Sequence, residues 1–311
     1  MVKIIASHYV LGSKKESLKE ICEQNSNWDY DRLLLKTGVL NRHILRKNES
    51  PEGLSVEAGI KCIEKIGNEK EIDGIIFVTQ SPSLPLPTRA CVLQDKLNIK
   101  KNSLAFDINQ GCSGFVYALS LATSLIKNKL TKRTIIICAD HYSKYIKKDD
   151  RTCRPIFSDA AAAVIVESSK ENDIQPFVFK TDGSGERFLT VIKDKGEKRL
   201  YMDGPAVLKF SLSFVPEATK ELLMKASLKK EDIDYFIFHQ ASAVVLNKLQ
   251  KKLEIDDKKW VNKIANIGNT VSATIPIAIN ILEEEKKFNN SKKYLLMGFG
   301  VGLSVAGCIL N

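Results

Sequence analysis

The cysteine best placed for chemistry is Cys112, in the segment DINQGCSGF at residues 107–115. The segment follows a strand-like apolar run and opens a stretch that is apolar nearly all round, which predicts a buried helix. Unpaired N–H groups and the helix dipole favour a thiolate at such a helix start, and small neighbours such as Gly111 let a substrate carbonyl approach the sulfur. Because buried cysteines are also ordinary core residues, Cys112 by itself fits a nucleophile and a structural role equally well.

Three further features lie beside predicted strands. His239 ends the run YFIFH directly before a predicted helix, although a lone histidine in such a place is more often a hydrogen-bonded core residue. Asn269 lies in the polar turn of NIGNTVSATIP, residues 266–276, and matters for chemistry only if its amide donates into a site. The segment GFGVG, residues 298–302, is expected to be a bend that presents a backbone N–H group. A thiol, an imidazole, an amide and an exposed N–H group together suit acyl transfer.

Strand-like runs alternate with helical segments along the chain, which predicts an α/β fold. Helical spacing of apolar residues predicts helices within 56–66, 115–126, 242–253 and 275–284. The runs rich in β-branched and apolar residues are 4–10, 74–79, 104–108, 134–139, 161–166, 177–179, 235–238, 294–299 and 303–310. Most of these runs lack strict alternation, as expected of strands covered on both faces.

The second half of the chain repeats the plan of the first. In each half a strand leads through a turn into a helix, at 109–126 and 236–253, and a small-residue strand closes the half, at 159–166 and 302–310. The segment 168–173 between them is short and polar. We therefore predict two similar halves, residues 1–170 and 171–311, that share one tight interface.

Composition narrows the class of protein. The chain has 47 Lys+Arg against 37 Asp+Glu, a net charge of +10, and 44% hydrophobic residues, which suits neither a disordered chain nor a membrane protein. Only 9 of the basic residues are arginine, which favours a solvated surface or an acidic protein partner over nucleic acid. The 7 cysteines lack a C-x-x-C pair, so we expect no disulfide framework, no metal site and a reducing cytoplasm. No run approaches the roughly 20 apolar residues of a transmembrane helix.

The ordered motifs NQGCSGF, FSDAAAAVIV, FHQAS, NIGNTVSATIP and GFGVGLS, spread over nearly the whole chain, resemble the thiolase-fold condensing enzymes. The most similar group is the β-ketoacyl-acyl-carrier-protein synthases III. The resemblance implies a five-layered α/β/α/β/α fold of two pseudo-repeated halves, a homodimer, and thioester substrates without a cofactor. Biosynthetic thiolases use a second cysteine in the last motif, which GFGVG lacks.

The resemblance also assigns roles to single residues. Cys112 would take an acyl group from a thioester. His239 and Asn269 would hold the carbonyl of the malonyl thioester and stabilise the enolate formed when carbon dioxide leaves. The backbone N–H groups of Cys112 and Val301 would form the oxyanion hole.

The stretch that binds coenzyme A in the family is altered in this chain. In members that initiate fatty acids, a Trp and an Arg stack on the adenine in a stretch that ends Arg-Thr-Gly. In WDYDRLLLKTG, Arg32 stands at the Trp position, Lys36 replaces the Arg and Trp28 is displaced by one helical turn, whereas the adenine-side Arg151 is kept. We therefore expect the acyl donor to be a carrier-protein thioester or an unusual CoA ester.

Positions on the pantetheine side differ as well. Ser242 and Val244 stand where the family has Asn and Arg after the histidine motif, and Pro205 replaces an Asn after Gly204. The loop SPSLPLP, residues 81–87, corresponds to one that crosses from the other subunit to line the acyl pocket. Its Leu86 takes a place often held by an aromatic residue, which predicts a wider acyl pocket.

The lysine excess has a candidate target in an acidic acyl carrier protein. Lys209, Lys251 and Lys252, on and near the helix after His239, are docking candidates, although a solvated helix face explains them equally well. Two alternatives to a condensing enzyme stay open. One is an acyltransferase that passes the acyl group to a hydroxyl or amine without decarboxylation, and the other is a catalytically silent partner subunit. Primary fatty-acid synthesis and specialised acyl chains both fit the sequence.

Overall fold

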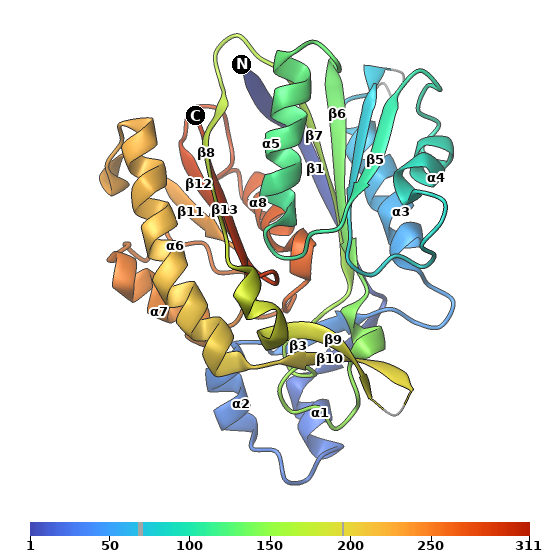
Figure 1. Cartoon of the computed structure of the whole chain (residues 1–311), viewed down its shortest axis with the longest axis vertical. Coiled ribbons are helices and arrows are strands. Elements are labelled where there is room, and N and C mark those ends of the chain that lie inside the picture. Colours follow the sequence, from blue (N-terminus) through green and yellow to red (C-terminus); the bar gives the residue numbers. More distant parts are fainter. Residues whose placement is uncertain (68–70, 195) are drawn as a thin grey trace.

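The computed structural model describes residues 1–67, 71–194 and 196–311, and two sheets dominate it (Figure 1). Within these residues the larger sheet has five strands in the order β1-β7-β6-β4-β5, and the other has four in the order β11-β12-β13-β8. All strands of the larger sheet come from residues 2–168, and those of the other from residues 174–310. Two short two-stranded sheets, β2-β3 and β9-β10, complete the described set.

The helices and strands up to residue 168 are β1 (Val2–Leu11), β2 (Lys14–Ser17), α1 (Leu18–Glu23), α2 (Tyr30–Thr37), β3 (Asn41–Ile44), α3 (Pro51–Glu64), β4 (Gly74–Val78), α4 (Arg89–Lys96), β5 (Leu104–Ile108), α5 (Gly114–Lys127), β6 (Arg133–Asp140), η2 (Tyr142–Tyr145) and β7 (Ala160–Ser168). Those that follow are β8 (Ile174–Thr181), η3 (Gly183–Phe188), β9 (Leu189–Asp194), β10 (Glu197–Met202), α6 (Gly204–Ala226), η4 (Lys230–Asp232), β11 (Tyr235–Phe238), α7 (Ala243–Leu253), η5 (Val271–Ala273), α8 (Thr274–Glu284), β12 (Tyr294–Gly300) and β13 (Ser304–Leu310).

Both sheets mix parallel and antiparallel pairs. In the larger sheet β6, β4 and β5 run parallel, whereas β7 pairs antiparallel with β6 and with β1. In the other sheet β11 runs parallel to β12, and β12, β13 and β8 pair antiparallel. Every residue of β4, β12 and β13 is buried, which explains why these strands read as continuous apolar runs.

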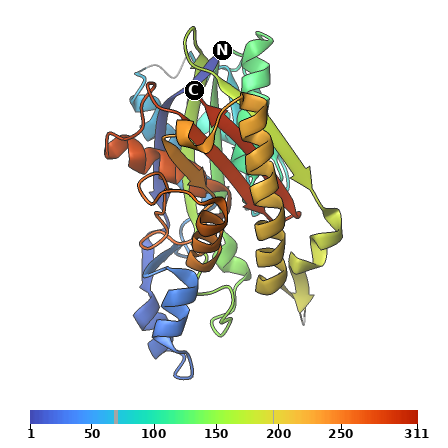
Figure 2. The same ribbon diagram turned by 90° about the vertical axis from the view of Figure 1, so that its left-hand side faces the viewer.

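The two sheets sandwich a central layer made of α5 and α8 (Figures 1 and 2). α5 contacts β4 and β6 on one side and β12 and β13 on the other, and α8 contacts β1, β7 and β11. α3 and α4 cover the outer face of the larger sheet, and α6 covers the outer face of the other with α7 packed beside it. The layers therefore run α/β/α/β/α, and the predicted five-layered α/β fold is confirmed.

One buried cluster joins both sheets through the central helices. It includes Phe115 of α5, Ile277 of α8, Val78 of the larger sheet and Leu296 of the other. The halves are thus parts of one tightly packed fold, and the boundary between residues 170 and 171 stays a prediction.

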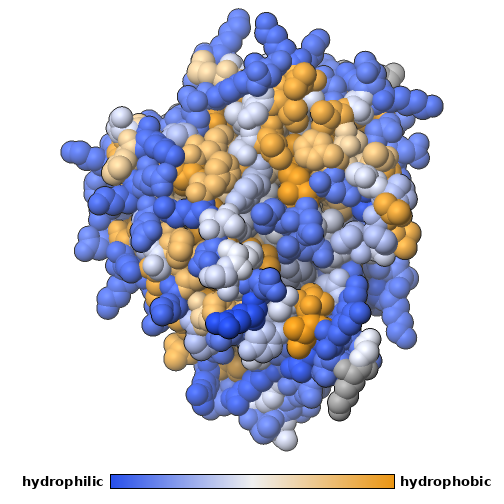
Figure 3. Space-filling model, in the orientation of Figure 1, coloured by the Kyte–Doolittle hydropathy of each residue, from blue (hydrophilic) through white to orange (hydrophobic). Residues whose placement is uncertain are grey.

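The nine predicted strand runs all correspond to strands, but two other expectations need correction. The segment GFGVG is not entirely a bend, because its first three residues form the buried end of β12 and the turn begins at Val301. α5 is not buried all round, because a helix between two sheets still has a free edge, where Leu121 is 42% exposed. Figure 3 shows hydrophobic side chains at the surface where α5 lies in Figure 1. The hairpin β9-β10 and the long helix α6 are elements that the apolar runs did not predict.

No helix among the described residues is both long and apolar enough to cross a lipid bilayer. All seven cysteines are free thiols.

Candidate active site

Cys112 lies in the tight turn between β5 and α5, pressed against the end of β12 from the other half of the chain. A Cβ atom on Gly300 would lie 2.9 Å from Cys112 Sγ, and one on Gly298 would lie 2.8 Å from the Cys112 carbonyl oxygen. Gly300 also has a φ of +152°, which side chains rarely adopt. The glycines of GFGVG therefore let the backbone of one half reach the sulfur held by the other half.

The Cys112 thiol is buried and protonated in the resting chain. Burial raises its pKa to about 12, although the backbone N–H groups of Val301 and of Cys112 itself oppose the rise. The N–H groups at the start of α5 favour the thiolate as expected, and desolvation of the buried sulfur opposes them. These two N–H groups are the ones to which the family resemblance assigns an oxyanion hole, and both lie at the sulfur.

His239 follows β11 and is buried, with 1% of its surface exposed. Its backbone N–H donates to the Met297 carbonyl oxygen at 2.8 Å, and its Nδ1 pairs with Thr274 Oγ1 at 2.7 Å. Burial lowers its pKa to about 3, so the ring is neutral at physiological pH. The ring also makes an edge contact with Phe299, with ring centroids 5.5 Å apart.

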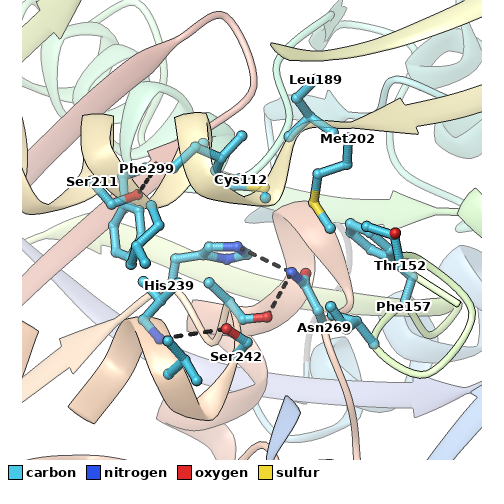
Figure 4. Close-up of a pocket in the computed structure, with 18 of the residues that line it drawn as sticks. Cys112, Thr152, Phe157, Leu189, Met202, Ser211, His239, Ser242, Asn269 and Phe299 are labelled. Carbon is cyan, nitrogen blue, oxygen red and sulfur yellow. Dashed lines mark hydrogen bonds between the residues drawn. The ribbon is translucent and has the colours of Figure 1, made fainter. Parts of the chain in front are cut away.

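Asn269 is fixed by both its backbone and its side chain. Its N–H donates to the Ile156 carbonyl oxygen at 2.9 Å, and its Oδ1 accepts from the Val271 N–H at 2.9 Å. Its Nδ2 donates to the Ala241 carbonyl oxygen at 3.2 Å and lies 3.5 Å from His239 Nε2. Figure 4 shows the Cys112 sulfur, the His239 ring and the Asn269 amide facing one cavity.

This active-site cavity has a volume of about 300 Å³ and mostly apolar walls, including Phe157, Leu189 and Met202. It brings together Cys112, His239 and Asn269, and of the predicted substrate-side residues it also brings in Lys36, Gly204 and Ser242. Ser242 caps α7, where its Oγ accepts from the Val245 N–H at 3.5 Å.

The other predicted substrate residues lie elsewhere. Arg32, Arg151 and Leu86 are exposed and do not line the active-site cavity. Trp28 is 9% exposed and packs in a small apolar cluster with Leu18, Ile21 and Leu33. Trp28 is therefore not available to stack on an adenine ring.

The predicted docking lysines are exposed. Lys209 and Lys252 line an open hollow of about 440 Å³, which shares Pro205 and Leu208 with the active-site cavity. Lys251 lies beside Lys252 in α7 but lines neither of these two spaces. Two of the three lysines thus lie at the mouth of the site.

Two groups that support the site were missed in the sequence. Thr274 lies inside the NIGNTVSATIP motif, but only the structure reveals that its hydroxyl meets His239. Asp140, fully buried at the end of β6, accepts from Ser81 Oγ at 3.0 Å and from Ser272 Oγ at 2.5 Å, and burial raises its pKa to about 6. Asp140 thus links the two halves of the chain beside the Asn269 turn. Its position directly after a predicted strand is the sequence feature that could have pointed to it. Among the described residues, no group of His, Cys, Asp and Glu side chains could hold a metal ion.

Comparisons with known proteins agree with this geometry. Residues 106–183 match the family model of 3-oxoacyl-[acyl-carrier-protein] synthase III, and residues 223–311 match the model of its C-terminal part. The chain is 33% identical to the β-ketoacyl-[acyl-carrier-protein] synthase III of Clostridium perfringens, with 96% of this chain and 94% of the relative covered. It is 31% identical to the enzyme of the same name from Syntrophomonas wolfei, with 95% and 92% covered.

A solved structure supports the same relationship. The crystal structure of 3-oxoacyl-[acyl-carrier-protein] synthase III from Aquifex aeolicus superposes with a TM-score of 0.94 at 30% identity and covers all of both chains. The motifs around Cys112, His239 and Asn269 thus lie in a chain that matches these relatives over nearly its full length. The chain belongs to the 3-oxoacyl-[acyl-carrier-protein] synthase III family of thiolase-fold condensing enzymes.

Proposed function

We propose that this protein condenses an acyl thioester with malonyl-acyl-carrier protein, with loss of carbon dioxide, to give a β-ketoacyl-acyl-carrier protein. The observation that carries the proposal is one cavity in which a buried thiol, a neutral imidazole and a fixed amide converge. These are the three side chains that decarboxylative condensation needs, and the chain's family supports this reaction in fatty-acid or specialised acyl-chain synthesis.

The first step is acyl transfer to Cys112. The sulfur attacks the thioester carbonyl, a new S–C bond forms, and the donor thiol leaves with the proton that Cys112 releases. The backbone N–H groups of Val301 and Cys112 stabilise the oxyanion of the tetrahedral intermediate. Their position at the sulfur supports this role.

The second step is decarboxylation and attack. His239 Nε2 and Asn269 Nδ2 donate to the thioester carbonyl oxygen of the malonyl group while its bond to the carboxylate breaks. The resulting enolate attacks the acyl carbon on Cys112, and the sulfur leaves and regains a proton. For Nε2 to donate, Nδ1 must accept the proton of Thr274 Oγ1, which lies 2.7 Å away. The same hydroxyl lies 3.2 Å from the Val271 carbonyl oxygen, so this tautomer requires the Thr274 proton to point to His239 rather than to Val271.

A carrier protein rather than coenzyme A fits the surroundings of the site as the acyl donor. Trp28 is packed in the core cluster, and the Arg32 and Arg151 side chains lie outside the cavity. Lys209 and Lys252 at the cavity mouth suit an acidic carrier protein. Steady-state comparison of acetyl-CoA with acyl-carrier-protein donors tests this point, and efficient use of micromolar acetyl-CoA would contradict it.

We further propose a homodimer that works in the cytoplasm. The loop at residues 81–87 leaves Leu84 56% exposed and Leu86 79% exposed, which suits cover by a second copy of the chain. The free cysteines suit a reducing compartment. Sedimentation velocity tests the dimer, and a monomer at micromolar concentration would overturn it.

The reaction itself is tested by following carbon dioxide. Purified enzyme that carries an acyl group on Cys112 receives malonyl-acyl-carrier protein, and carbon dioxide and product are both measured. Release of carbon dioxide with formation of β-ketoacyl product is expected. Transfer of the acyl group to a hydroxyl or amine acceptor without release of carbon dioxide would contradict the proposal.

A further inference from the structure

A second cavity, of about 190 Å³, adjoins the active-site cavity, and we call it the side cavity. Leu189 lines both spaces, and Val301, whose N–H group lies at the Cys112 sulfur, lines the side cavity. Tyr142, another lining residue, belongs to the same buried cluster as Cys112. An acyl group on Cys112 therefore has the side cavity within reach. At about 30 Å³ per water-sized group, the space suits a short acyl chain.

The walls of the side cavity are not uniformly apolar. Gln80 and Tyr142 place an amide and a phenol beside the Val301 side chain. The other lining residues are Asn109, Tyr145, Leu189, Thr190, Val191 and Leu200, which mix polar and hydrocarbon surface. The Tyr142 hydroxyl donates to Gln80 Oε1 at 2.8 Å, and Tyr142 itself is only 5% exposed. The two side chains form one hydrogen-bonded unit, which we call the Gln80–Tyr142 pair.

The position of Gln80 depends on the motif that carries the nucleophile. A Cβ atom on Gly111 would lie 2.5 Å from Gln80 Oε1, so the glycine directly before Cys112 makes room for the amide. The backbone N–H of Gln80 donates to Asp140 Oδ1 at 2.9 Å, which anchors the residue at the buried carboxylate. The pair is thus built into the site rather than left at a loose surface.

Counting donors and acceptors shows what the pair lacks. Within the described residues Gln80 Nε2 has no hydrogen-bond partner, yet it is not sealed from the surrounding space. The Tyr142 hydroxyl donates its proton to Gln80, and its oxygen keeps a free lone pair. If the amide is turned over, Nε2 donates to Tyr142, and the phenol proton and Oε1 become free instead. In both orientations the pair offers at least one free donor and one free acceptor.

We propose that the side cavity selects a short acyl group that bears a hydroxyl, and that the Gln80–Tyr142 pair recognises this hydroxyl by hydrogen bonds. A hydroxyl is a small neutral group that accepts one hydrogen bond and donates another, so it can pair with a free donor and a free acceptor of the pair at once. A plain hydrocarbon chain displaces water from these polar groups and returns no hydrogen bond, which disfavours its binding. This inference rests on the proposed function, since it names the acyl group that Cys112 receives.

The test measures acylation of Cys112 by intact-protein mass spectrometry. The donors are butyryl-pantetheine and the two enantiomers of 3-hydroxybutyryl-pantetheine, which need neither adenine contacts nor carrier docking. The wild-type chain should prefer one hydroxybutyryl enantiomer over butyryl by at least about tenfold in kcat/KM, roughly one hydrogen bond's worth. Tyr142→Phe and Gln80→Met, which keep size and remove the polar groups, should each reduce that ratio about tenfold.

A matched control uses a tyrosine that lines neither cavity. Tyr201 is 44% exposed on β10, and Tyr201→Phe should keep the wild-type ratio. Equal or better acylation by butyryl in the wild type would overturn the inference and leave the proposed function standing. An unchanged ratio in both Tyr142→Phe and Gln80→Met would do the same. If a folded wild-type chain accepts no acyl group either from these donors or from acyl-carrier-protein thioesters, the proposed function fails and this inference falls with it.

Discussion

Thr274 provides the sharpest test of how His239 works. Its hydroxyl is the partner of His239 Nδ1, at 2.7 Å in a fully buried setting. Thr274→Val keeps the shape of the side chain and leaves that nitrogen unpaired, which costs about 1–3 kcal/mol. At 1.36 kcal/mol per factor of ten, decarboxylation should slow by about 5- to 150-fold. Acylation of Cys112 should continue, because the backbone N–H groups serve that step.

The assay separates the two steps. Mass spectrometry follows the acyl adduct on Cys112, and carbon dioxide release from malonyl-acyl-carrier protein follows the second step. Thr274→Ser restores the hydroxyl and should recover most of the rate. Thr123→Val is the matched control, because Thr123 Oγ1, buried in α5, has no hydrogen-bond partner among the described residues. Decarboxylation at the wild-type rate in Thr274→Val, or an equal loss in Thr274→Ser, would refute the role of this hydrogen bond.

Three further predictions concern the backbone, pH and docking. Gly300→Ala places a methyl group 2.9 Å from the Cys112 sulfur and should abolish acylation. Gly183→Ala, which has open space around it, is the control and should be acylated normally. Acylation of the Gly300→Ala enzyme would refute the steric argument. Because the pKa of His239 is lowered to about 3, its ring stays neutral as the pH falls from 8 to 5. The rate of decarboxylation should therefore not fall on the acidic side near pH 6.5, the ordinary pKa of histidine. A fall near that pH that disappears in His239→Gln would contradict this prediction. Charge reversal at Lys251 and Lys252 should raise KM for the carrier-protein substrate several-fold and leave acylation by small pantetheine thioesters unchanged. Equal effects on the carrier-protein and the pantetheine substrates would argue against docking of the carrier protein at these lysines.

Much of the fold is predictable because its central strands are buried on both faces. Continuous apolar runs such as 235–238 and 294–299 correspond to β11 and β12 with nearly the same bounds. The hairpin β9-β10 escaped prediction because its apolar stretches, Leu189–Ile192 and Leu200–Met202, are short, largely exposed and separated by charged residues. α6 contains Pro216, a residue that ordinarily interrupts a helix, and this weakened its pattern.

The site was predictable in its reacting groups and not in its electrostatics. Cys112, His239 and Asn269 each follow or begin an element whose pattern is strong, and the structure brings all three into one cavity. The protonation of Cys112 could not be read from the motif, because the helix start favours the thiolate while burial, a property of the whole fold, opposes it. The partners Thr274 of His239 and Tyr142 of Gln80 likewise depend on contacts between segments far apart in the chain.

The most direct test of the central claim is a single-turnover measurement on acylated enzyme. Protein with one acyl group on Cys112 is mixed with malonyl-acyl-carrier protein, and the adduct, carbon dioxide and β-ketoacyl product are followed together. The proposed mechanism predicts that the adduct disappears as carbon dioxide and product form in equal amounts. Loss of the adduct without carbon dioxide, or product formation by a Cys112→Ala variant at the wild-type rate, would contradict it.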